Sequence, residues 1–238
     1  MRVIDVPASA GFAWIKMSFL LFRAQPTGWL TLLAAWLLAS LGLLIVPFIG
    51  GAIFGILQPG FFAGFVIAAR DQEAGKPVGV HQLLAGFRFN GKPLVTIGSI
   101  TLLANLLVFG ILVMAGFPMT MEAGAQGMPD MAAFSRSLQG KEWIAWLGLA
   151  LSMVIKGILW FTCALLALNQ MPATHAIRWS FYALVANFLP MLVFAALMTA
   201  LFIFAALPFL LGMLIAMPVF AIVHYVSYRD LFRASDAA

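Results

Sequence analysis

Residues 58–71, QPGFFAGFVIAARD, decide the fold class of this chain. The span before Arg70 is taken to begin at Gly51, after the breakers Pro47 and Gly50, and about 20 apolar residues are what an α-helix needs to cross the hydrocarbon core of a bilayer. The run ends in the charged pair Arg70-Asp71, which belongs at a membrane surface. The stretch therefore predicts a membrane-spanning helix over residues 51–69 that contains Pro59 and stops at a polar boundary.

A second stretch, MPVFAIVHYVSYRD at residues 217–230, has the same layout. Arg229 follows Pro218 by the same eleven positions that separate Arg70 from Pro59. We interpret the two stretches as the returning spans of a parallel repeat, both running from outside to inside. Their arginines then reach the lipid phosphates at one surface, while the adjacent aspartates offset part of the charge or cap the following turn. The two prolines are candidate hinges.

The composition is that of a membrane protein. Of the 238 residues, 64% are hydrophobic and 9% are charged, whereas a soluble domain is about half apolar and a quarter charged. The net charge of +5 does not indicate nucleic-acid binding, because the basic residues stand singly at the ends of apolar segments. The one cysteine, Cys163, excludes an internal disulfide framework and a multi-cysteine metal cluster.

Six segments of the chain are long and apolar enough to span a bilayer. They are residues 27–48, 51–69, 94–117, 143–168, 189–207 and 209–228. We predict an all-α integral membrane protein whose six transmembrane helices form three helical hairpins in a single polytopic domain over 1–238. Three repeat units, at about 8–71, 79–170 and 172–232, each combine one hairpin with the segment before it.

The segment before each hairpin is expected to form an amphipathic interfacial helix. Apolar side chains recur at intervals of three and four in residues 12–22, 83–87 and 177–188, as they do on one face of such a helix. A proline then opens each span, and Gln25, Asn90 or Asn187 comes just before it. Proline suits a first helical turn, and we expect the preceding amide side chain to cap the exposed backbone amides.

Lysine and arginine predict how the chain is oriented in the membrane. Placing both termini in the cytoplasm leaves ten of the 13 Lys and Arg residues inside and two, Arg136 and Lys141, outside. This imbalance follows the positive-inside rule. The candidate contacts to lipid headgroups are arginines at the cytoplasmic ends of helices: Arg23, Arg70, Arg88, Arg178 and Arg229.

Three short motifs at the membrane borders carry a resemblance to a known group of proteins. They are Gln-Pro-x-x-Trp at 25–29, Asn-x-x-Pro at 187–190 and Tyr-Arg-Asp-Leu-Phe at 228–232. With the aromatic segment before the first span, they make the chain resemble a family of small six-span bacterial inner-membrane proteins of uncharacterised function. The resemblance covers nearly the whole chain. It implies a bacterial inner membrane and a six-helix fold, and it carries over no catalytic residue.

Lys156 is the most unusual residue of the predicted spans. It lies near the middle of 143–168, where a lysine costs about 2.5–3.5 kcal/mol to insert. No Asp or Glu lies inside any predicted span, so Asn105, Ser152 and Trp160 are its expected neighbours. These four residues are candidates for binding an anion, a lipid headgroup or an acidic residue of a partner helix. The alternative is a lysine that extends to the interface or stays neutral within the helix bundle.

The predicted external loop contains four weak candidates for metal ligands, Met119, Met121, Met128 and Met131. Spaced thioethers suit Cu(I), because soft sulfur prefers that ion. No His or Cys accompanies them, and a flexible apolar surface explains the same methionines. We therefore expect no metal site and no cofactor.

The sequence contains none of the common catalytic motifs and no pair of carboxylates inside the predicted spans. We expect a non-enzymatic inner-membrane protein that acts as a partner or scaffold for a membrane complex or for lipids. Its expected partners are membrane lipids, other membrane proteins or a second copy of the chain. The alternative is a small transporter or channel for an apolar, lipid-like or copper substrate, which the repeat and the mid-span prolines favour.

Overall fold

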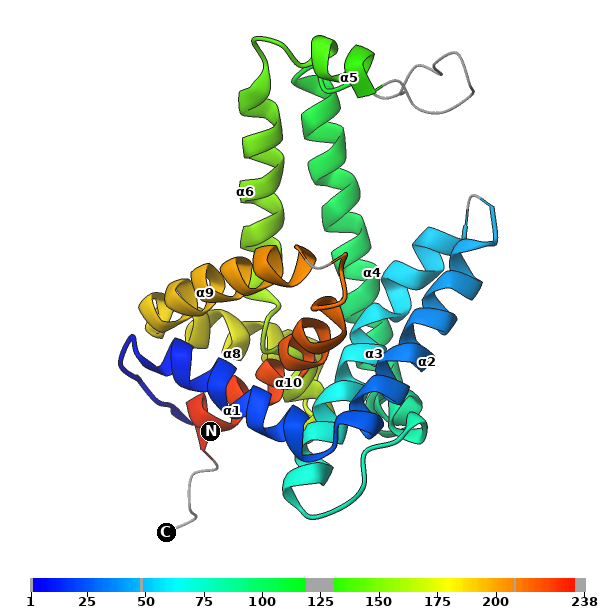
Figure 1. Cartoon of the computed structure of the whole chain (residues 1–238). Helices are drawn as coiled ribbons and strands as arrows, with labels where there is room; N and C mark the ends of the chain where they lie inside the picture. The colour runs from blue at the N-terminus through cyan, green and yellow to red at the C-terminus, as the bar shows by residue number, and fades with distance from the viewer. Residues whose placement is uncertain (1, 48, 119–130, 208, 234–238) are drawn as a thin grey trace. The chain divides into compact units, whose positions relative to one another are not determined.

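Helices make up most of the structure, a computed structural model that describes residues 2–47, 49–118, 131–207 and 209–233 (Figure 1). The side chains of residues 131, 132 and 233 are not described. In chain order the elements are β1 (Arg2–Val3), α1 (Ala10–Ala24), α2 (Pro26–Leu44), α3 (Gly50–Glu73), the 3₁₀ helix η1 (Val80–Leu84), α4 (Ala85–Met114), α5 (Met131–Ser137), α6 (Glu142–Ile158), α7 (Thr162–Asn169), α8 (Ala173–Ala186), α9 (Phe188–Ala206), α10 (Met213–Leu231) and β2 (Phe232–Arg233).

The chain divides into two compact units. The first compact unit comprises residues 1–99 with 158–238, and the second comprises residues 100–157. Helix α4 begins in the first and ends in the second. The single polytopic domain expected from the sequence stays a prediction.

Five helical segments of the described residues are long and apolar enough to cross a membrane. They are Pro26–Leu44, Gly50–Glu73, Val80–Met114, Glu142–Asn169 and Phe188–Ala206. The protein is therefore an all-α membrane protein with several spans. Helix α10 is not among the five, because polar residues such as His224, Arg229 and Asp230 occupy its second half. The sixth span and the three-hairpin arrangement stay predictions.

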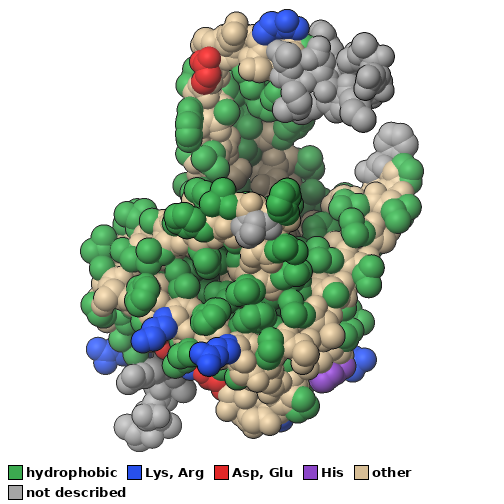
Figure 2. Space-filling model, viewed as in Figure 1, with side chains coloured by type: hydrophobic (Ala, Val, Ile, Leu, Met, Phe, Trp, Pro, Cys, Tyr) green, Lys and Arg blue, Asp and Glu red, His purple; other side chains and the backbone are tan. Residues whose placement is uncertain are grey.

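Helices α3, α7 and α10 form the centre of the first compact unit. Each of the three packs against the other two. The central helix α3 is more buried than the peripheral helix α2. In the most apolar stretch of each, 56% of α3 lies inside the protein and 22% of α2. We refer to α3, α7 and α10 as the central helices. Figure 2 shows hydrophobic side chains over most of the visible face of this unit, with Lys and Arg gathered along one edge.

The elements that precede the predicted hairpins, α1, η1 and α8, each pack against one of the central helices. Helix α1 contacts α9 and α10, η1 contacts α2 and α3, and α8 contacts α7. Two of these contacts are so close that they require glycine. A Cβ atom on Gly11 would lie 2.5 Å from the carbonyl oxygen of Pro190, and one on Gly64 would lie 2.6 Å from that of Gln82.

Two of these preceding elements bear on the expectation of amphipathic helices. Helix α1 buries Trp14 and Phe22, and its exposed surface carries Phe12 and Phe19 beside Lys16. The second element is short, because the chain is a 3₁₀ helix at η1 and kinks at Asn90, whose φ of −150° and ψ of 48° are not helical. The amphipathic character of these segments stays a prediction.

The predicted span 143–168 is broken into α6 and α7. The backbone N–H of Phe161 donates to the side-chain oxygen of Ser180 at 3.0 Å instead of to a carbonyl of its own helix. Trp160 therefore lies in the break and not on the helix of Lys156. The break expected between the last two spans is present, since α9 ends at Ala206 and α10 begins at Met213.

Two short strands near the ends of the chain pair within the first compact unit. Strand β1 pairs antiparallel with β2, so that Arg2 lies opposite Arg233 and Val3 opposite Phe232. The backbone N–H of Ile4 also donates to the carbonyl oxygen of Leu231 at 3.0 Å. The first and last described residues are therefore neighbours in space (Figure 1).

The second compact unit contains the end of α4, α5 and nearly all of α6. Helices α4 and α6 lie side by side there, and a Cβ on Gly148 would be 2.8 Å from Leu112. Large apolar side chains on both helices face outward, among them Leu107 and Trp146, which is 70% exposed. This hairpin thus presents an apolar surface to its surroundings.

Candidate functional site

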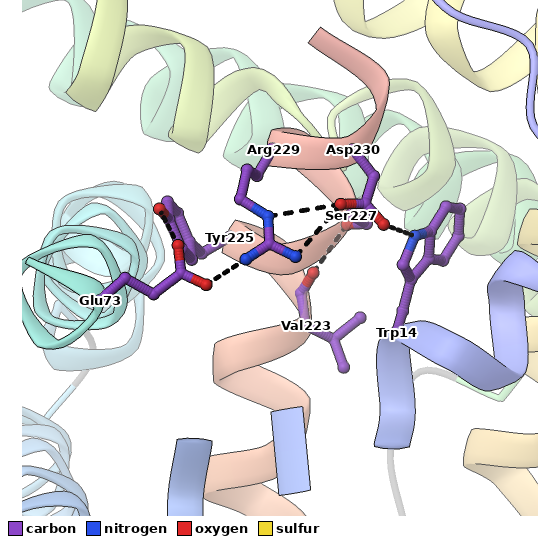
Figure 3. Close-up of polar contacts among 7 residues, drawn as sticks. All are labelled: Trp14, Glu73, Val223, Tyr225, Ser227, Arg229 and Asp230. Atoms are coloured by element: carbon purple, nitrogen blue, oxygen red, sulfur yellow. Dashed lines mark hydrogen bonds and ion pairs between the residues drawn. The ribbon is translucent and has the colours of Figure 1, made fainter. Parts of the chain in front are cut away.

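The C-terminal ends of the central helices meet in a group of polar side chains that we call the polar junction: Glu73, Asn169, Tyr225, Tyr228, Arg229 and Asp230. Glu73, at the end of α3, accepts a hydrogen bond from the Tyr225 hydroxyl at 2.7 Å and forms an ion pair with Arg229 (Figure 3). The Tyr228 hydroxyl donates to the side-chain oxygen of Asn169, at the end of α7. The polar junction therefore ties α10 to both other central helices.

The Arg-Asp pairs at the ends of α3 and α10 have the same internal contact. In each, a guanidinium nitrogen of the arginine donates to Oδ1 of the neighbouring aspartate, at 2.8 Å for Arg70 and Asp71 and at 3.2 Å for Arg229 and Asp230. Each aspartate thus offsets the charge of its neighbour, as the sequence predicts. The contact of these arginines with lipid phosphates stays a prediction.

The second oxygen of each aspartate holds one of the elements that precede a hairpin. Asp71 Oδ2 accepts from the side-chain amide of Gln82 in η1 at 3.4 Å. Asp230 Oδ2 accepts from the indole N–H of Trp14 in α1 at 3.0 Å (Figure 3). The repeated Arg-Asp pair therefore has the same structural use in both places, which is to anchor an element from elsewhere in the sequence.

The amide residues before the spans do not cap their helices, contrary to expectation. Gln25 and Asn187 occupy the N-cap positions of α2 and α9, yet neither side chain bonds to a backbone amide of its helix. Both residues and Asn90 have non-helical backbone angles, with φ of −141°, −114° and −150° respectively. The chain turns at each of these positions, and the side chain is directed elsewhere.

The three amide side chains bind segments remote in sequence. The bonds are from Val78 N to Gln25 Oε1 at 2.8 Å, from Val6 N to Asn187 Oδ1 at 2.9 Å, from Asn187 Nδ2 to Ile4 O at 3.1 Å and from Asn90 Nδ2 to Leu166 O at 3.0 Å. These partners are backbone groups that have no hydrogen-bond partner within a helix. Leaving such a group buried and unpaired costs about 1–3 kcal/mol. The three side chains thus pair backbone groups of another segment rather than those of the helix that follows them.

The candidate headgroup arginines fall into two classes. Arg70 and Arg229 are paired with carboxylates. Arg23, Arg88 and Arg178 are exposed, and no ion pair holds them among the described residues. Arg178 lies over the ring of Tyr182, 5.5 Å from its centre. Arg23, Arg88 and Arg178, which pair with no carboxylate of the described residues, are the ones whose charge is available to an external anion.

The residues expected around Lys156 are divided between the compact units. Lys156 and Asn105 are exposed and Ser152 is half-buried in the second unit, and within the described part of the chain no hydrogen bond joins them. Trp160 belongs to the first unit, where it stacks on His224 with ring centres 3.9 Å apart. The binding site proposed for these four residues stays a prediction.

The remaining candidates are the prolines and the methionines. Pro59 and Pro218 are buried within α3 and α10, both of which continue past the proline as helix. Met119, Met121 and Met128 lie outside the described residues, and Met131 begins α5 with its side chain not described. Across the described ranges, no three His, Cys, Asp or Glu side chains gather in a way that would hold a metal ion.

The sequence analysis did not identify Glu73, Asn169 and Tyr225 of the polar junction, nor Trp14, which bonds to Asp230. Glu73 had a signal, because it stands two residues after the first Arg-Asp pair. Trp14 had none, since it lies among apolar residues of α1, several of which are exposed. Its role depends on α10, more than 200 positions away.

Replacing Glu73 by glutamine is expected to lower the free energy of unfolding by about 1 kcal/mol or less. The substitution removes the ion pair with Arg229, whose side chain is 35% exposed and still bonds to Asp230. Surface charge pairs are screened by salt, so the loss should shrink further at high ionic strength. Unfolding in detergent at low and high salt measures it. A loss above about 2 kcal/mol that persists in salt would contradict this description of the junction.

The five membrane-length apolar segments, with the polar junction at the ends of the central helices, define a multi-span membrane protein. The chain is 30% identical over 185 residues to a protein of Burkholderia thailandensis named as a probable inner membrane protein, and the match covers 76% of this chain and 68% of that relative. The chain belongs to this family of bacterial inner-membrane proteins. No protein-family model and no solved structure matches it.

Proposed function

We propose that this protein is a non-enzymatic inner-membrane scaffold that holds lipids or a partner membrane protein. The observation that carries the proposal is the position of Lys156. It lies in the last turn of α6, and its neighbours Met153 and Val154 on that helix are exposed and apolar. Within the described part of the chain, neither a carboxylate nor a hydrogen-bond acceptor contacts it. A lysine on an apolar membrane surface needs an anionic partner, and none of the described residues pairs with it; we infer that a lipid or another protein supplies the anion.

The scaffold has six spans in this proposal, with both termini in the cytoplasm. The pairing of β1 with β2 supports an even number of crossings, because it holds both ends of the chain on one side of the membrane. Six spans satisfy this condition if α10 joins the five segments that qualify by length and composition. The excess of Lys and Arg predicted on the same side makes that side the cytoplasm. Helices α1 and α8 then lie at the cytoplasmic interface.

The internal repeat is part of the same proposal. Two sets of contacts support it. Asp71 and Asp230 hold η1 and α1 by equivalent carboxylate oxygens. Gln25 and Asn187 hold the segments that lead into those elements. Each preceding element thus rests on a different hairpin from its own, and the hairpins of the first compact unit are locked to one another. A closed arrangement of this kind suits a rigid scaffold rather than a protein that opens a pathway.

Replacing Lys156 by leucine is expected to reduce recovery of an anionic partner about tenfold or more, since a hydrogen bond to a charged group contributes about 1.5–3 kcal/mol. Insertion and stability should be unchanged, because Lys156 makes no contact that the fold depends on among the described residues. Co-purification of tagged protein from its own membrane, with mass spectrometry of what is retained, measures the effect. Lys141→Leu, a lysine of the connection before α6, is the matched control. Equal recovery with both variants would remove Lys156 from the proposal.

A further inference from the structure

A groove on the first compact unit has the dimensions and lining of a small-molecule site. It has a volume of about 550 Å³ and lies between α2, α3 and η1. Its walls include Ala35, Ala39 and Gly42 from α2, Phe61 from α3 and Leu84 from η1. Sites for small ligands commonly enclose about 300–1,000 Å³. The residues that line this groove are without exception apolar or glycine.

We propose that this groove holds an acyl chain of an anionic phospholipid. Helices α2 and α3 are both of membrane length, so the medium that reaches a groove between them is hydrocarbon. The outer surface of α2 beside it exposes Leu38 and Leu41, as a lipid-facing helix does. An alkyl chain fills an apolar groove of this kind without leaving a polar group unpaired.

The basic residues next to η1 select the headgroup. Val80 and Leu84 line the groove, His81 is next to the first of them in sequence, and Arg88 is one helical turn beyond the second. Both His81 and Arg88 are exposed, and no ion pair holds Arg88 in the described part of the chain. Lys76, in the connection just before η1, is 65% exposed but already pairs with Asp71 at 3.8 Å. A phosphate linked to the buried chain finds His81 and Arg88 beside the η1 wall of the groove.

The site does not depend on the scaffold function, because a transporter of this fold would carry the same groove. The two proposals are also tested by different variants, Gly42→Trp for the groove and Lys156→Leu for the scaffold, in different compact units. The lipid site therefore stands or falls by its own experiment.

Gly42 provides the test, because a Cβ on this residue would have no atom within 4 Å. Gly42→Trp should fill the groove without disturbing the fold. Gly51→Trp is the matched control, since Gly51 is equally open and does not line the groove. Purified protein in detergent is incubated with radiolabelled phosphatidylglycerol, and the label retained on each molecule is counted. We expect retention to fall at least about tenfold in Gly42→Trp, as several methylene contacts are lost, and to be unchanged in Gly51→Trp.

A double variant, His81→Gln with Arg88→Gln, tests the headgroup and alters only exposed side chains. We expect its preference for phosphatidylglycerol over phosphatidylethanolamine to fall about fivefold or more. Equal retention by wild type, Gly42→Trp and Gly51→Trp would overturn the acyl-chain site. If Gly42→Trp instead converted a dimer to a monomer with lipid retention unchanged, the groove would be a surface between two copies and the proposal would fail. An unaltered lipid preference in the double variant would overturn the anionic assignment.

Discussion

Trp14→Ala is expected to destabilise the protein by about 3–5 kcal/mol, the usual cost of truncating a fully buried aromatic side chain. Trp14 has no exposed surface. Its ring packs edge-on against Phe194 at 6.4 Å between centres, and its indole N–H donates to Asp230 at 3.0 Å. The substitution removes the packing and deprives Asp230 of a donor at the same time. Unfolding of the detergent-solubilised protein by increasing amounts of a denaturing detergent measures the loss.

Two further variants separate the causes of this effect. Trp14→Phe keeps most of the buried ring and removes the hydrogen bond, so its cost should be about 1–3 kcal/mol. Trp146→Ala is the control for removing a tryptophan, because Trp146 is 70% exposed in the second compact unit. It should leave the free energy of unfolding nearly unchanged. If Trp14→Ala and Trp146→Ala were equally stable, α1 would not be held against α9 and α10 as described.

Gly64→Leu is expected to cost about 3 kcal/mol, at the upper end for overpacking a closed contact. A Cβ at this position would lie 2.6 Å from the carbonyl oxygens of both Gln82 and Leu83. These are backbone atoms of η1, so the whole element has to move away from α3 to make room. The same denaturation experiment measures the change in unfolding free energy.

Gly51→Leu is the matched control, on the same helix. Nothing lies within 4 Å of a Cβ on Gly51, and leucine is the better helix former by up to about 1 kcal/mol. The two substitutions should therefore have opposite signs, with Gly64→Leu destabilising and Gly51→Leu neutral or slightly stabilising. A stabilising Gly64→Leu would show that η1 does not rest on α3.

The membrane class and most helix positions follow from the sequence because they depend on local composition. An apolar run of about 20 residues needs no tertiary information to be identified. The Arg-Asp pairs are also local, since each arginine bonds to its own neighbour in sequence. The residues that determine these features therefore lie next to one another in the sequence.

The features that the sequence did not reveal depend on distant partners. The break between α6 and α7 rests on Ser180, which takes the N–H of Phe161. The amides at Gln25 and Asn187 were expected to cap their own helices, but other segments supply better partners for them. Sequence rules predict how a side chain bonds to the backbone next to it. At these positions the side chains instead bond to backbone groups far away in the sequence.

The repeated stretches have an explanation in these distant contacts. In each Arg-Asp pair, one carboxylate oxygen of the aspartate binds the neighbouring arginine and the other binds a separate element, η1 for Asp71 and α1 for Asp230. The aspartate anchors the separate element and also neutralises the arginine beside it. The pair therefore places no unpaired charge at the membrane border.

Native mass spectrometry of the tagged protein, extracted gently from its own membrane, tests the proposed scaffold function most directly. We expect the wild-type protein to retain a partner protein or anionic lipid at a fixed stoichiometry, and Lys156→Leu to lose it while Lys141→Leu keeps it. A wild-type protein that retains neither, and that concentrates a solute when reconstituted into vesicles, would contradict the scaffold and establish a transporter instead.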